Sequence, residues 1–532
     1  IIGCLVSDNF PPAKADDIIS VVQNVFMQNM ELTMPENSVL IEPAVLDIGL
    51  LEFEKVHQLV DSGYNSCMEK MPQILEMISR RETESERREK RDKFNHKKPP
   101  LFFYKIEAEG VNEKQEEYIS VMIDKNKDIL SAKEVDKNYS LIQADNVIQS
   151  ITPQAIYDTT HNQYILNLKI KEKRHFEASL GGNFSIGGQS QGYLGVKFRD
   201  FNRHSWSTTL DGYFGSFYNS INLSNRINYP SNALLYAIAD IGVNHKDYQG
   251  TTPTININRK TTYLIQREIH GCLKLGLSLS KRSDLSLSAA YFNTNDRFYN
   301  TERYSSEDTN DEDIFKGANI NLCFSHNTLN DKTYPTKGTK FRAKIENTFG
   351  TEEYIAGSTS LHESFSDKKH NWYTANILYN GYSNITEKFS IGLIGELQLS
   401  TQNVWSNYET SIIHADTYEP FDDIKLRFLD SNRGYNFVGA GVKLIYSLPM
   451  SLMLQAEAHC FAPFNKIEKQ IDQNAALGKL FAEVNYMANL GIIFKNNVAP
   501  ISINFSLYDS KIIPYALTFN IGYILFNKYA RE

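Results

Sequence analysis

The sequence lacks the short motifs that mark many metal proteins and helical membrane proteins. Its five cysteines lie far apart and form no CxxC pair, which argues against a zinc site or a disulfide framework. No uninterrupted apolar run reaches about 18 residues, so the sequence predicts no transmembrane helix. Neither HExxH nor the GK[ST] of a phosphate-binding loop occurs, and the twelve histidines are scattered. We therefore expect no enzyme activity, no cofactor and no metal.

The chain also lacks an excess of positive charge. Its formal net charge of -8 argues against nucleic acid as a partner, because phosphate binding requires a clustered cationic surface. The mean hydropathy of -0.39 is low but does not exclude a membrane. A transmembrane barrel alternates lipid-facing with lumen-facing residues, so its average hydropathy stays low. The aromatic content of 12% fits such a barrel and also fits a soluble β-protein.

Residues 1–100 form a first zone, which we predict to be a helical, charged N-terminal extension. Apolar residues recur at helical spacing in two places, and the second stripe contains Pro72, which predicts a kink or two helices. The charged run "SRRETESERREKRDK" follows and is typical of a solvated helix or a linker. The two stripes consist of Ile18, Val22, Val25 and Phe26, and of Val60, Tyr64, Cys67, Met71, Ile74 and Ile78.

Residues 101–174 form a second zone with the predicted order strand, helix, helix, strand, strand. "LFFYKIEAEG" is typical of a strand, and two helical segments follow it. "PQAIYDTT" and "QYILNLKIKEK" then predict a strand pair with a turn at His161 and Asn162. The zone is therefore expected to be a small α+β module whose helices cover one face of a short sheet.

From residue 175 to 532 nearly every segment alternates apolar and polar residues with period two. In "KFSIGLIGELQLS" the apolar face contains Phe389, Ile391 and Leu393, and "YALTFNIGYILF" near the end repeats the pattern. Soluble strands cluster near about 5–6 residues, whereas a tilted strand that crosses the hydrocarbon core needs about 9–11. The segments here are long enough to span a membrane.

A sheet that crosses lipid must close on itself, because an open edge would leave backbone groups without hydrogen-bond partners. Long and short connections alternate along this zone, as expected when one rim carries loops and the other carries tight turns. The candidate strands number sixteen, or seventeen if residues 355–383 form two. We predict a closed transmembrane β-barrel of about sixteen antiparallel strands over residues 175–532, since an even number closes such a barrel.

Three features together resemble a known family. A small α+β module at 101–174 directly precedes the barrel, and "FSHNTLNDKTYPTKGTKFRAKIENTFG" at 324–350 contains a "D...PT.G" turn between two strands. "RGY", formed by Arg433, Gly434 and Tyr435, lies in the longest predicted loop. In this order, the features resemble the outer-membrane β-barrel assembly proteins of the BamA type, and most closely the barrel subunit of the mitochondrial sorting and assembly machinery (SAM).

The resemblance covers residues 101–532 and implies roles for particular residues. The module would be a POTRA-like domain, and the loop with Arg433 would fold into the lumen, where the arginine contacts the inner wall. A charge in this confined interior needs a partner. Glu457 is the first candidate, and Glu483 and Glu396 are the next.

The resemblance also implies a function. The first strand, near 175–187, and the last, 514–526, would meet at a seam that Gly181 and Gly182 weaken, because glycine offers no side-chain packing. The open seam would pair with precursor strands and insert them into the lipid bilayer by β-augmentation, with accessory subunits of an assembly complex. On the last strand, Asn520, Gly522 and Leu525 resemble the signal of mitochondrial barrels, although Asn527 departs from it.

The expected location is the mitochondrial outer membrane, with the POTRA-like domain facing the intermembrane space. The chain continues through "KYARE" after the last strand, which disfavours a bacterial outer membrane. The main alternative is a protein-translocating or passive channel of an organelle outer membrane, including a plastid envelope channel. A soluble β-propeller is a further alternative, but it needs internal repeats of about 40 residues, which the sequence does not show.

Overall fold

The computed structural model describes residues 2–5, 35–44, 55–78, 82–97, 101–123, 129–185, 189–231, 234–248, 263–301, 304–496, 499–510 and 513–531. It divides the chain into two compact units, Ile1–Pro100 and Leu101–Glu532. Among the described residues, no helix combines the length and the apolar character needed to cross a membrane.

The first unit contains two short parallel strands and two helices, namely β1 (Ile2–Cys4), β2 (Val39–Ile41), α2 (Val56–Met77) and α3 (Glu84–His96). α2 continues through Pro72 as one helix, so the alternative of two helices is wrong. Of its predicted apolar stripe, Ile74 is buried and packs with Val39 and Ile41. The predicted helix around Ile18 lies outside the described residues.

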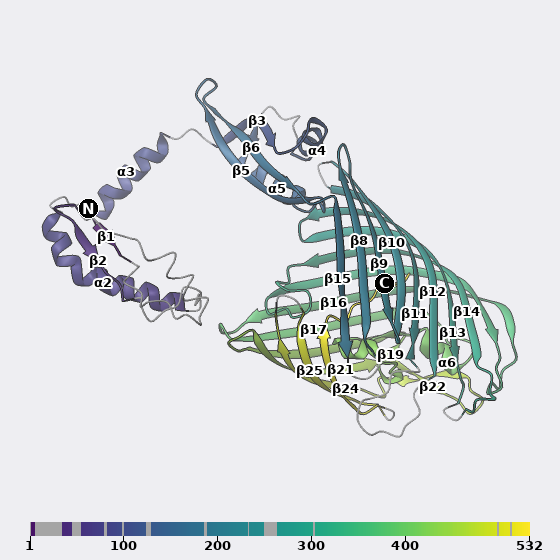
Figure 1. Ribbon diagram of the computed structural model, residues 1–532. Coiled ribbons are helices and arrows are strands. Elements are labelled where there is room, and N and C mark those ends of the chain that lie inside the picture. Colours follow the sequence, from purple (N-terminus) through teal and green to yellow (C-terminus); the bar gives the residue numbers. More distant parts are fainter. Residues whose placement is uncertain are drawn as a thin grey trace, which may run out of the picture. The chain divides into compact units, whose positions relative to one another are not determined.

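The second unit begins with an α+β module. Its elements are β3 (Phe102–Glu109), α4 (Glu113–Ile123), β4 (Leu130–Ser131), α5 (Ala132–Ile142), β5 (Ile148–Asp158) and β6 (Gln163–Glu172). The sheet order is β4-β3-β6-β5, with β3 parallel and β5 antiparallel to β6 (Figure 1). Tyr118 and Met122 of α4 and Ile142 of α5 pack onto Leu166 and Leu168 of β6, and this apolar cluster forms the core of the module.

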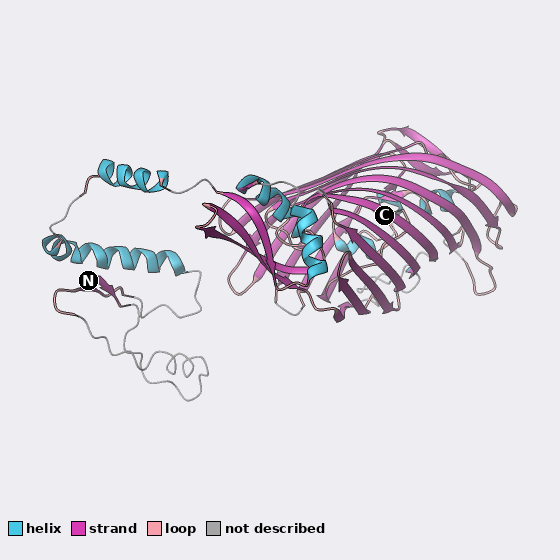
Figure 2. Ribbon diagram, turned by 90° about the horizontal axis from the view of Figure 1, so that it is seen from above, coloured by secondary structure: helices cyan, strands magenta, loops and turns pink. Residues whose placement is uncertain are grey.

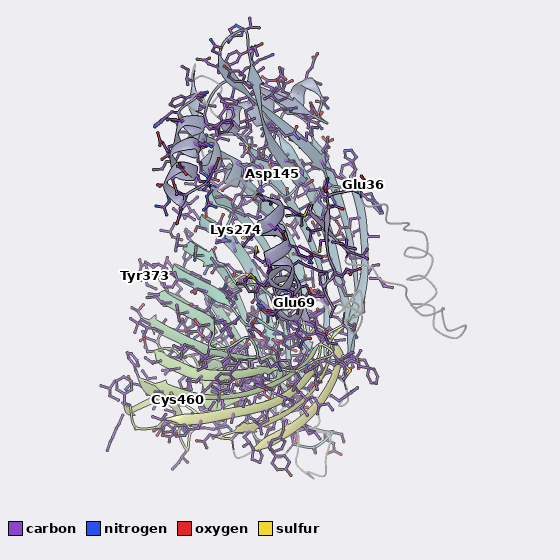
Figure 3. The ribbon with its side chains drawn as sticks, turned by 90° about the vertical axis from the view of Figure 1, so that its left-hand side faces the viewer. Glu36, Glu69, Asp145, Lys274, Tyr373 and Cys460 are labelled. Carbon is purple, nitrogen blue, oxygen red and sulfur yellow. The ribbon has the colours of Figure 1, made fainter. Side chains whose placement is uncertain are left out.

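Asp145 fixes this module to the barrel. Asp145, which is labelled in Figure 3, is 1% exposed. It accepts hydrogen bonds from Ser205 Oγ at 2.8 Å and from Asn228 Nδ2 at 2.9 Å, both on barrel strands. The Tyr118 hydroxyl of the module donates to the same carboxylate. Burial, together with the Asp145 charge, raises the pKa of Tyr118 well above its ordinary value, so the phenol remains a donor. Asp145 therefore links both parts through one carboxylate.

The barrel closes through sixteen antiparallel strands, which confirms the predicted closed barrel and its strand number (Figures 1 and 2). Its strands are β7 (Phe176–Ser185), β8 (Gln191–Phe201), β9 (Ser205–Gly215), β10 (Tyr218–Tyr229), β11 (Leu234–Asp247), β12 (Leu264–Ser280), β13 (Ser283–Phe298), β14 (Asp311–Asn327), β15 (Gly338–Ile355), β16 (Phe365–Asn384), β17 (Phe389–Ser400), β20 (Phe437–Ser447), β21 (Leu452–Pro463), β24 (Asn485–Phe494), β25 (Ile501–Tyr508) and β26 (Tyr515–Gly522).

The barrel wall has an apolar exterior and a polar interior. On β14, Ile320 and Leu322 are about half exposed, whereas the alternate residues Asn319 and Asn321 are buried inside. Strands such as β20, β21 and β24 show the same alternation, and it is the reverse of a soluble β-protein, whose apolar side chains face the core. The exterior therefore fits contact with lipid, as in outer-membrane barrels.

The connections alternate between two rims. Most short turns lie on the rim next to the α+β module and most longer loops lie on the opposite rim, with residues 328–337 and the turn at 216–217 among the exceptions. The longest loop, residues 401–436, contains α6 (Tyr408–Ile413), β18 (Asp416–Thr417), η3 (Asp422–Leu426), η4 (Asp430–Asn432) and β19 (Arg433–Gly434). The connection between β21 and β24 forms a hairpin of β22 (Asn465–Lys469) and β23 (Ala475–Leu480).

Candidate functional site: the lumenal loop and the seam

The loop of residues 401–436 folds inside the barrel, and we call it the lumenal loop. Its own short sheet pairs Asp416 with Gly434 and Thr417 with Arg433. Asn407 caps α6, since its Oδ1 accepts a hydrogen bond from the Thr410 backbone at 2.8 Å. Most of the loop is buried against wall residues, and its most buried apolar members are Ile412, Tyr418, Ile424, Leu426, Leu429 and Tyr435.

Among the described residues, Arg433 binds carbonyl oxygens at and just after the end of α6 and no carboxylate of the wall. Its Nη1 donates to the carbonyl oxygens of Ala415 at 3.0 Å and Ile413 at 3.3 Å. Its guanidinium lies 4.2 Å from the centre of the Phe428 ring. Carbonyls at a helix C-terminus have no intrahelical partner and carry partial negative charge, so they suit a cation. Arg433 therefore ties two parts of the loop together.

The predicted partners of Arg433 are wrong, because each glutamate has another partner. Glu457 lies 3.5 Å from Lys443 and 3.3 Å from His459. Glu483 pairs with Lys466 at 2.5 Å near the hairpin of β22 and β23. Glu396 accepts a hydrogen bond from Asn376 at 2.8 Å. Arg433 Nη1 is bound by the carbonyls at the end of α6 and the guanidinium lies over the Phe428 ring, whereas Nε is buried without a hydrogen-bond partner among the described residues.

Gly434 and Tyr435 complete the motif. The Tyr435 hydroxyl donates to the Ser411 carbonyl oxygen at 3.2 Å, so it binds the same helix that Arg433 binds. A Cβ on Gly434 would lie 3.6 Å from both Phe461 and Pro463, which is ordinary van der Waals contact. Backbone geometry therefore does not require glycine at this position, and the motif acts mainly through Arg433 and Tyr435.

A ring stack docks the loop onto β13 to β16. The Trp405 indole of the loop lies between two imidazoles, with its ring centre 3.6 Å from that of His414 and 4.2 Å from that of His370. Each imidazole contacts a buried carboxylate. His414 Nε2 lies 2.7 Å from Asp313 Oδ2, and His370 Nε2 lies 2.6 Å from Glu352 Oε2.

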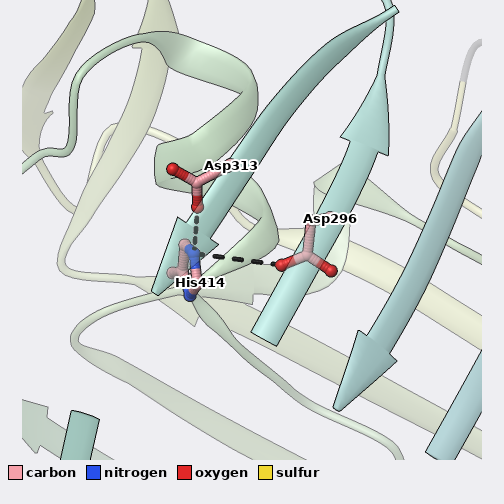
Figure 4. Close-up of side chains that lie close together, drawn as sticks. All are labelled: Asp296, Asp313 and His414. Atoms are coloured by element: carbon pink, nitrogen blue, oxygen red, sulfur yellow. Dashed lines mark hydrogen bonds and ion pairs between the residues drawn. The ribbon is translucent and has the colours of Figure 1, made fainter. Parts of the chain in front are cut away.

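Asp296, Asp313 and His414 are residue types that can hold a metal ion, and their ligand atoms lie within 4.8 Å of one another (Figure 4). The distance of 2.7 Å between His414 and Asp313 is that of a hydrogen bond. Burial lowers the pKa of His414 to about 4, which favours a neutral imidazole at pH 7, and a neutral imidazole can share one hydrogen bond with Asp313. We interpret the cluster as a docking contact of the loop. Sequence reasoning missed it, although Asp313 lies at an inward position of a strand.

The second half of the loop docks on β24 and β25, near the seam. Arg427 Nε donates to Asp423 Oδ2 at 3.1 Å within the loop, and the hydroxyl of Tyr508, at the end of β25, donates to the same carboxylate. Asn432 Nδ2 contacts Met487 Sδ of β24 at 3.0 Å. The loop therefore bridges the lumen from β13–β16 to the strands next to the seam.

The seam joins β7 and β26. Among the described residues, pairing runs from Asn520 opposite Ser185 to Gly522 opposite Asn183, and residues 186–188, which would be next in register, lie outside the described residues. By comparison, β12 and β13 pair through sixteen residues on each strand. Residues 176–182 of β7 pair with β8 but not with β26, which leaves their other backbone edge outside the barrel ladder.

Two glycines allow the close approach at the seam. Gly522 has φ +106°, and a Cβ there would lie 2.1 Å from the Gly182 carbonyl oxygen. A Cβ on Gly182 would lie 2.5 Å from the Gln191 carbonyl oxygen. A Cβ on Gly181 would meet only the Tyr193 ring, at 3.7 Å, so steric space at the seam requires Gly182 and Gly522 but not Gly181.

The last strand is shorter than expected. β26 ends at Gly522, so Leu525 is not part of the seam strand, and its carbonyl oxygen instead accepts a hydrogen bond from Gln191 Nε2 at 2.8 Å. The positive φ of Gly522 turns the chain out of the wall. Of the expected first strand, residues 186–188 lie outside the described residues.

The expectation that the sequence contains no GxSxG motif is wrong, because residues 188–192 match it once. Its serine, Ser190, lies in the connection between β7 and β8 and donates to the Ser185 carbonyl oxygen at 3.1 Å. The nucleophile motif of hydrolases lies between a strand and a helix. Ser190 instead lies in a strand-to-strand connection, so the match gives no support to a hydrolase.

A closed sixteen-stranded barrel with an apolar exterior and a folded lumenal loop belongs to the class of outer-membrane β-barrels. BamA from Haemophilus ducreyi lacking POTRA domains 1–3 matches with a TM-score of 0.50 at 15% identity, over 79% of this chain and 84% of that one. CdiB from Acinetobacter baumannii matches with a TM-score of 0.47 at 12% identity, over 98% of this chain and 88% of that one.

The similarity to BamA extends to the fold alone at this level of identity. No protein-family model matches the sequence, and no curated protein sequence matches it. The structural match to BamA confirms the expected BamA-type fold. The closer resemblance to the mitochondrial SAM subunit stays a prediction.

Proposed function

We propose that this protein inserts and folds β-barrel precursor proteins into the mitochondrial outer membrane through the seam between β7 and β26. The free edge of β7 carries this proposal, because residues 176–182 pair with β8 on one side and with no described strand on the other. An extended precursor strand can pair with such an edge by β-augmentation. Its backbone groups then enter lipid already hydrogen-bonded, which avoids several kcal/mol per unpaired group. This process needs no covalent chemistry and no catalytic residue.

The α+β module supports the proposal as a POTRA-like domain. It is fixed on the rim where β8, β9 and β10 meet their short turns, because Asp145 binds Ser205 and Asn228 there. A precursor that is held by this module would lie next to the strands that lead to the seam. The module would face the intermembrane space, and accessory subunits would bind outside the barrel.

The mitochondrial location rests on the resemblance to the SAM subunit and on the last strand. Asn520 and Gly522 of β26 match the pattern of mitochondrial barrel signals. Neither observation depends on the fold, which bacterial and organelle barrels share. Fractionation of the native membranes, with the protein followed by antibody, would test the location separately from the activity.

A protein-translocating or passive channel remains the alternative function. The lumenal loop argues against a wide permanent pore, because its buried residues Tyr418 and Tyr435 and the Trp405 stack occupy the interior. In planar bilayers we expect low conductance from the purified protein. A large steady conductance without any effect on precursor insertion would favour the channel.

A reversible lock of the seam tests the proposed function. Phe184 lies directly opposite Ile521, so a Phe184→Cys and Ile521→Cys pair can form a disulfide after the native cysteines are replaced. We expect the oxidised protein to lose insertion of newly imported barrel precursors, measured on native gels, and to regain it when reduced.

The matched control lies on the opposite wall. Leu322 of β14 is opposite Ile345 of β15, and both side chains are exterior. A Leu322→Cys and Ile345→Cys disulfide should leave insertion unchanged. If the seam lock is equally harmless, precursors do not enter through this seam and the proposal fails.

A further inference from the structure

Residues 328–337 connect β14 to β15 on the rim next to the α+β module, and we call them the strap. They carry the D...PT.G motif, which ends at Gly338. Asp331 Oδ1 accepts hydrogen bonds from the Thr333 N–H at 2.9 Å and from the Tyr334 N–H at 3.0 Å. Gly338 has φ +101°, and a Cβ there would collide with the first carbonyl group of the strap. The motif therefore gives the strap a defined backbone.

Two side chains of the strap pack onto the inner wall of the barrel. Leu329 and Tyr334 pack against an apolar cluster of four buried residues. One residue comes from each of β16, β20, β21 and β24, and the four are Tyr382, Ile445, Met453 and Ile493. The strap starts at β14, so these contacts take it across the module-side opening of the lumen toward the short strands.

Lys495, the first residue after β24, joins this strand to the strap. Its Nζ donates to Asp331 Oδ2 at 2.9 Å and to the Tyr334 carbonyl oxygen at 3.1 Å, and it lies 5.5 Å from the centre of the Tyr334 ring. The side chains of Lys495 and Asp331 are 34% and 37% exposed, so the ion pair by itself contributes little. The apolar contacts of Leu329 and Tyr334 therefore supply most of the attachment, and Lys495 fixes its position.

The attachment is linked to the seam through the connection between β24 and β25. Lys495 begins this connection and Pro500 ends it. The Pro500 carbonyl oxygen accepts a hydrogen bond at 2.8 Å from the N–H of Gly522, the seam glycine of β26. β25 and β26 also pair from Ile501 opposite Ile521 onward. Movement of β26 away from β7 therefore pulls on the connection that the strap holds.

We propose that the strap restrains the separation of β26 from β7, with Tyr334 and the Asp331–Lys495 pair as its positioning residues. Two anchors then hold β24, β25 and β26 from inside. One is the lumenal loop, through Met487 and Tyr508, and the other is the strap on the module-side rim. Wide opening of the seam requires the strap to release Lys495. The effect on precursor entry rests on the proposed function, but the restraint itself does not.

Hydrogen exchange of the purified protein in lipid nanodiscs, without any precursor, tests the restraint. The readout is the exchange of the amides of residues 183–185 and 520–522, which pair across the seam. Tyr334→Ala removes the ring from the apolar cluster and should accelerate this exchange by about thirtyfold. Tyr299→Ala is the matched control. It removes a ring from the connection between β13 and β14 on the opposite rim, and should leave seam exchange unchanged.

A double-mutant cycle tests the charged pair. Lys495→Met keeps an unbranched side chain without the charge and should accelerate seam exchange by about threefold. Lys495→Arg keeps the charge and should exchange at the parent rate. Asp331→Asn keeps an oxygen for the turn, and its combination with Lys495→Met should exchange no faster than Lys495→Met alone. Fully additive effects would show that the two residues act separately, which would overturn their role as a pair.

A triple variant, with Leu329→Ala, Tyr334→Ala and Lys495→Met, removes all the contacts at once. The proposal is overturned if seam exchange in this variant stays within about twofold of the parent protein while the amides of residues 328–337 lose their protection. It is also overturned if residues 328–337 stay protected, because contacts other than these would then hold the strap.

Insertion assays separate this proposal from the proposed function. If seam exchange accelerates in Tyr334→Ala but the 184–521 lock leaves precursor insertion unchanged, the strap restrains the seam and the assembly function fails. If seam exchange does not respond to the strap variants while the 184–521 lock still blocks insertion, the assembly function stands and the restraint by the strap fails.

Discussion

The two sides of the barrel wall are built differently. Strands β12 to β16 are 16 to 20 residues long, whereas β24, β25 and β26 have ten, eight and eight. At ~3.3 Å per residue an eight-residue strand is about 26 Å long, and a tilt of ~40° reduces its height to about 20 Å. The hydrocarbon core is ~30 Å thick. The bilayer next to the seam must therefore be thinner than elsewhere to match the height of the shorter wall.

The first prediction sharpens this comparison through hydrogen exchange. Amides of residues 517–522 and 181–185 should exchange about a thousandfold faster than those of 318–323 and 343–348, because short pairing opens locally without global unfolding. Mass spectrometry of the protein in nanodiscs measures both sets in one sample. Equal protection on the two sides would remove the seam as the weak junction of the barrel.

The second prediction concerns the loop that bridges the two sides. Arg433→Ala removes the hydrogen bonds to the end of α6 and the contact with Phe428, so limited proteolysis within residues 401–436 should accelerate by tens of fold. Glu483→Gln is the control, because this exposed glutamate pairs with Lys466 outside the loop, and it should leave cleavage unchanged. If the two variants are equally sensitive, the contacts of Arg433 with the end of α6 do not hold the loop.

The third prediction concerns the glycine that turns the chain at the seam. Gly522→Ala places a side chain in the left-handed region and against Gly182, which costs about 1–2 kcal/mol, or roughly tenfold in the folded fraction. Gly181→Ala is the matched control, since its Cβ has room. The midpoint of heat-modifiable mobility on gels measures both. Similar midpoints for the two variants would show that the turn at Gly522 is dispensable.

The fourth and smallest effect concerns the α+β module, which is fixed near the seam side. Asp145→Asn weakens the contacts with Ser205 and Asn228 by about 1 kcal/mol. Pulsed electron paramagnetic resonance between labels at positions 154 and 387 should then show a broader distance distribution. The control is Lys281→Ala. Lys281 lies in the turn between β12 and β13 and makes an exposed contact with Gln143 of the module, so its loss should not broaden the distance distribution.

Period-two alternation was sufficient to predict the barrel, because a closed wall between lipid and a polar interior imposes that pattern on every strand. The alternation in residues 389–400 and 514–522 gave the correct faces. The same pattern also misled, since Tyr523 and Leu525 continue it although the chain turns inward at Gly522. The inward position of residues 523–531 depends on contacts with β10, β11, β12 and β15, which the alternation pattern does not reveal.

The interior contacts were beyond the reach of sequence patterns. Arg433 was expected to need a carboxylate, but the carbonyls at the end of a six-residue helix bind it instead, and such a partner depends on how a loop folds. Asp145 also gave no signal, since its partners lie 60 and 83 positions away. The partners of residues in the loop and the lumen could therefore be identified only from the three-dimensional structure.

The stacked rings of Trp405 supply a natural optical probe. The protein has three tryptophans, and only Trp405 lies between two imidazoles, His370 from the wall and His414 from the loop. Imidazole, above all when protonated, quenches indole emission on contact. In a protein with Trp206 and Trp372 replaced by phenylalanine, brightness would follow the departure of the loop from the wall in real time, without any attached dye.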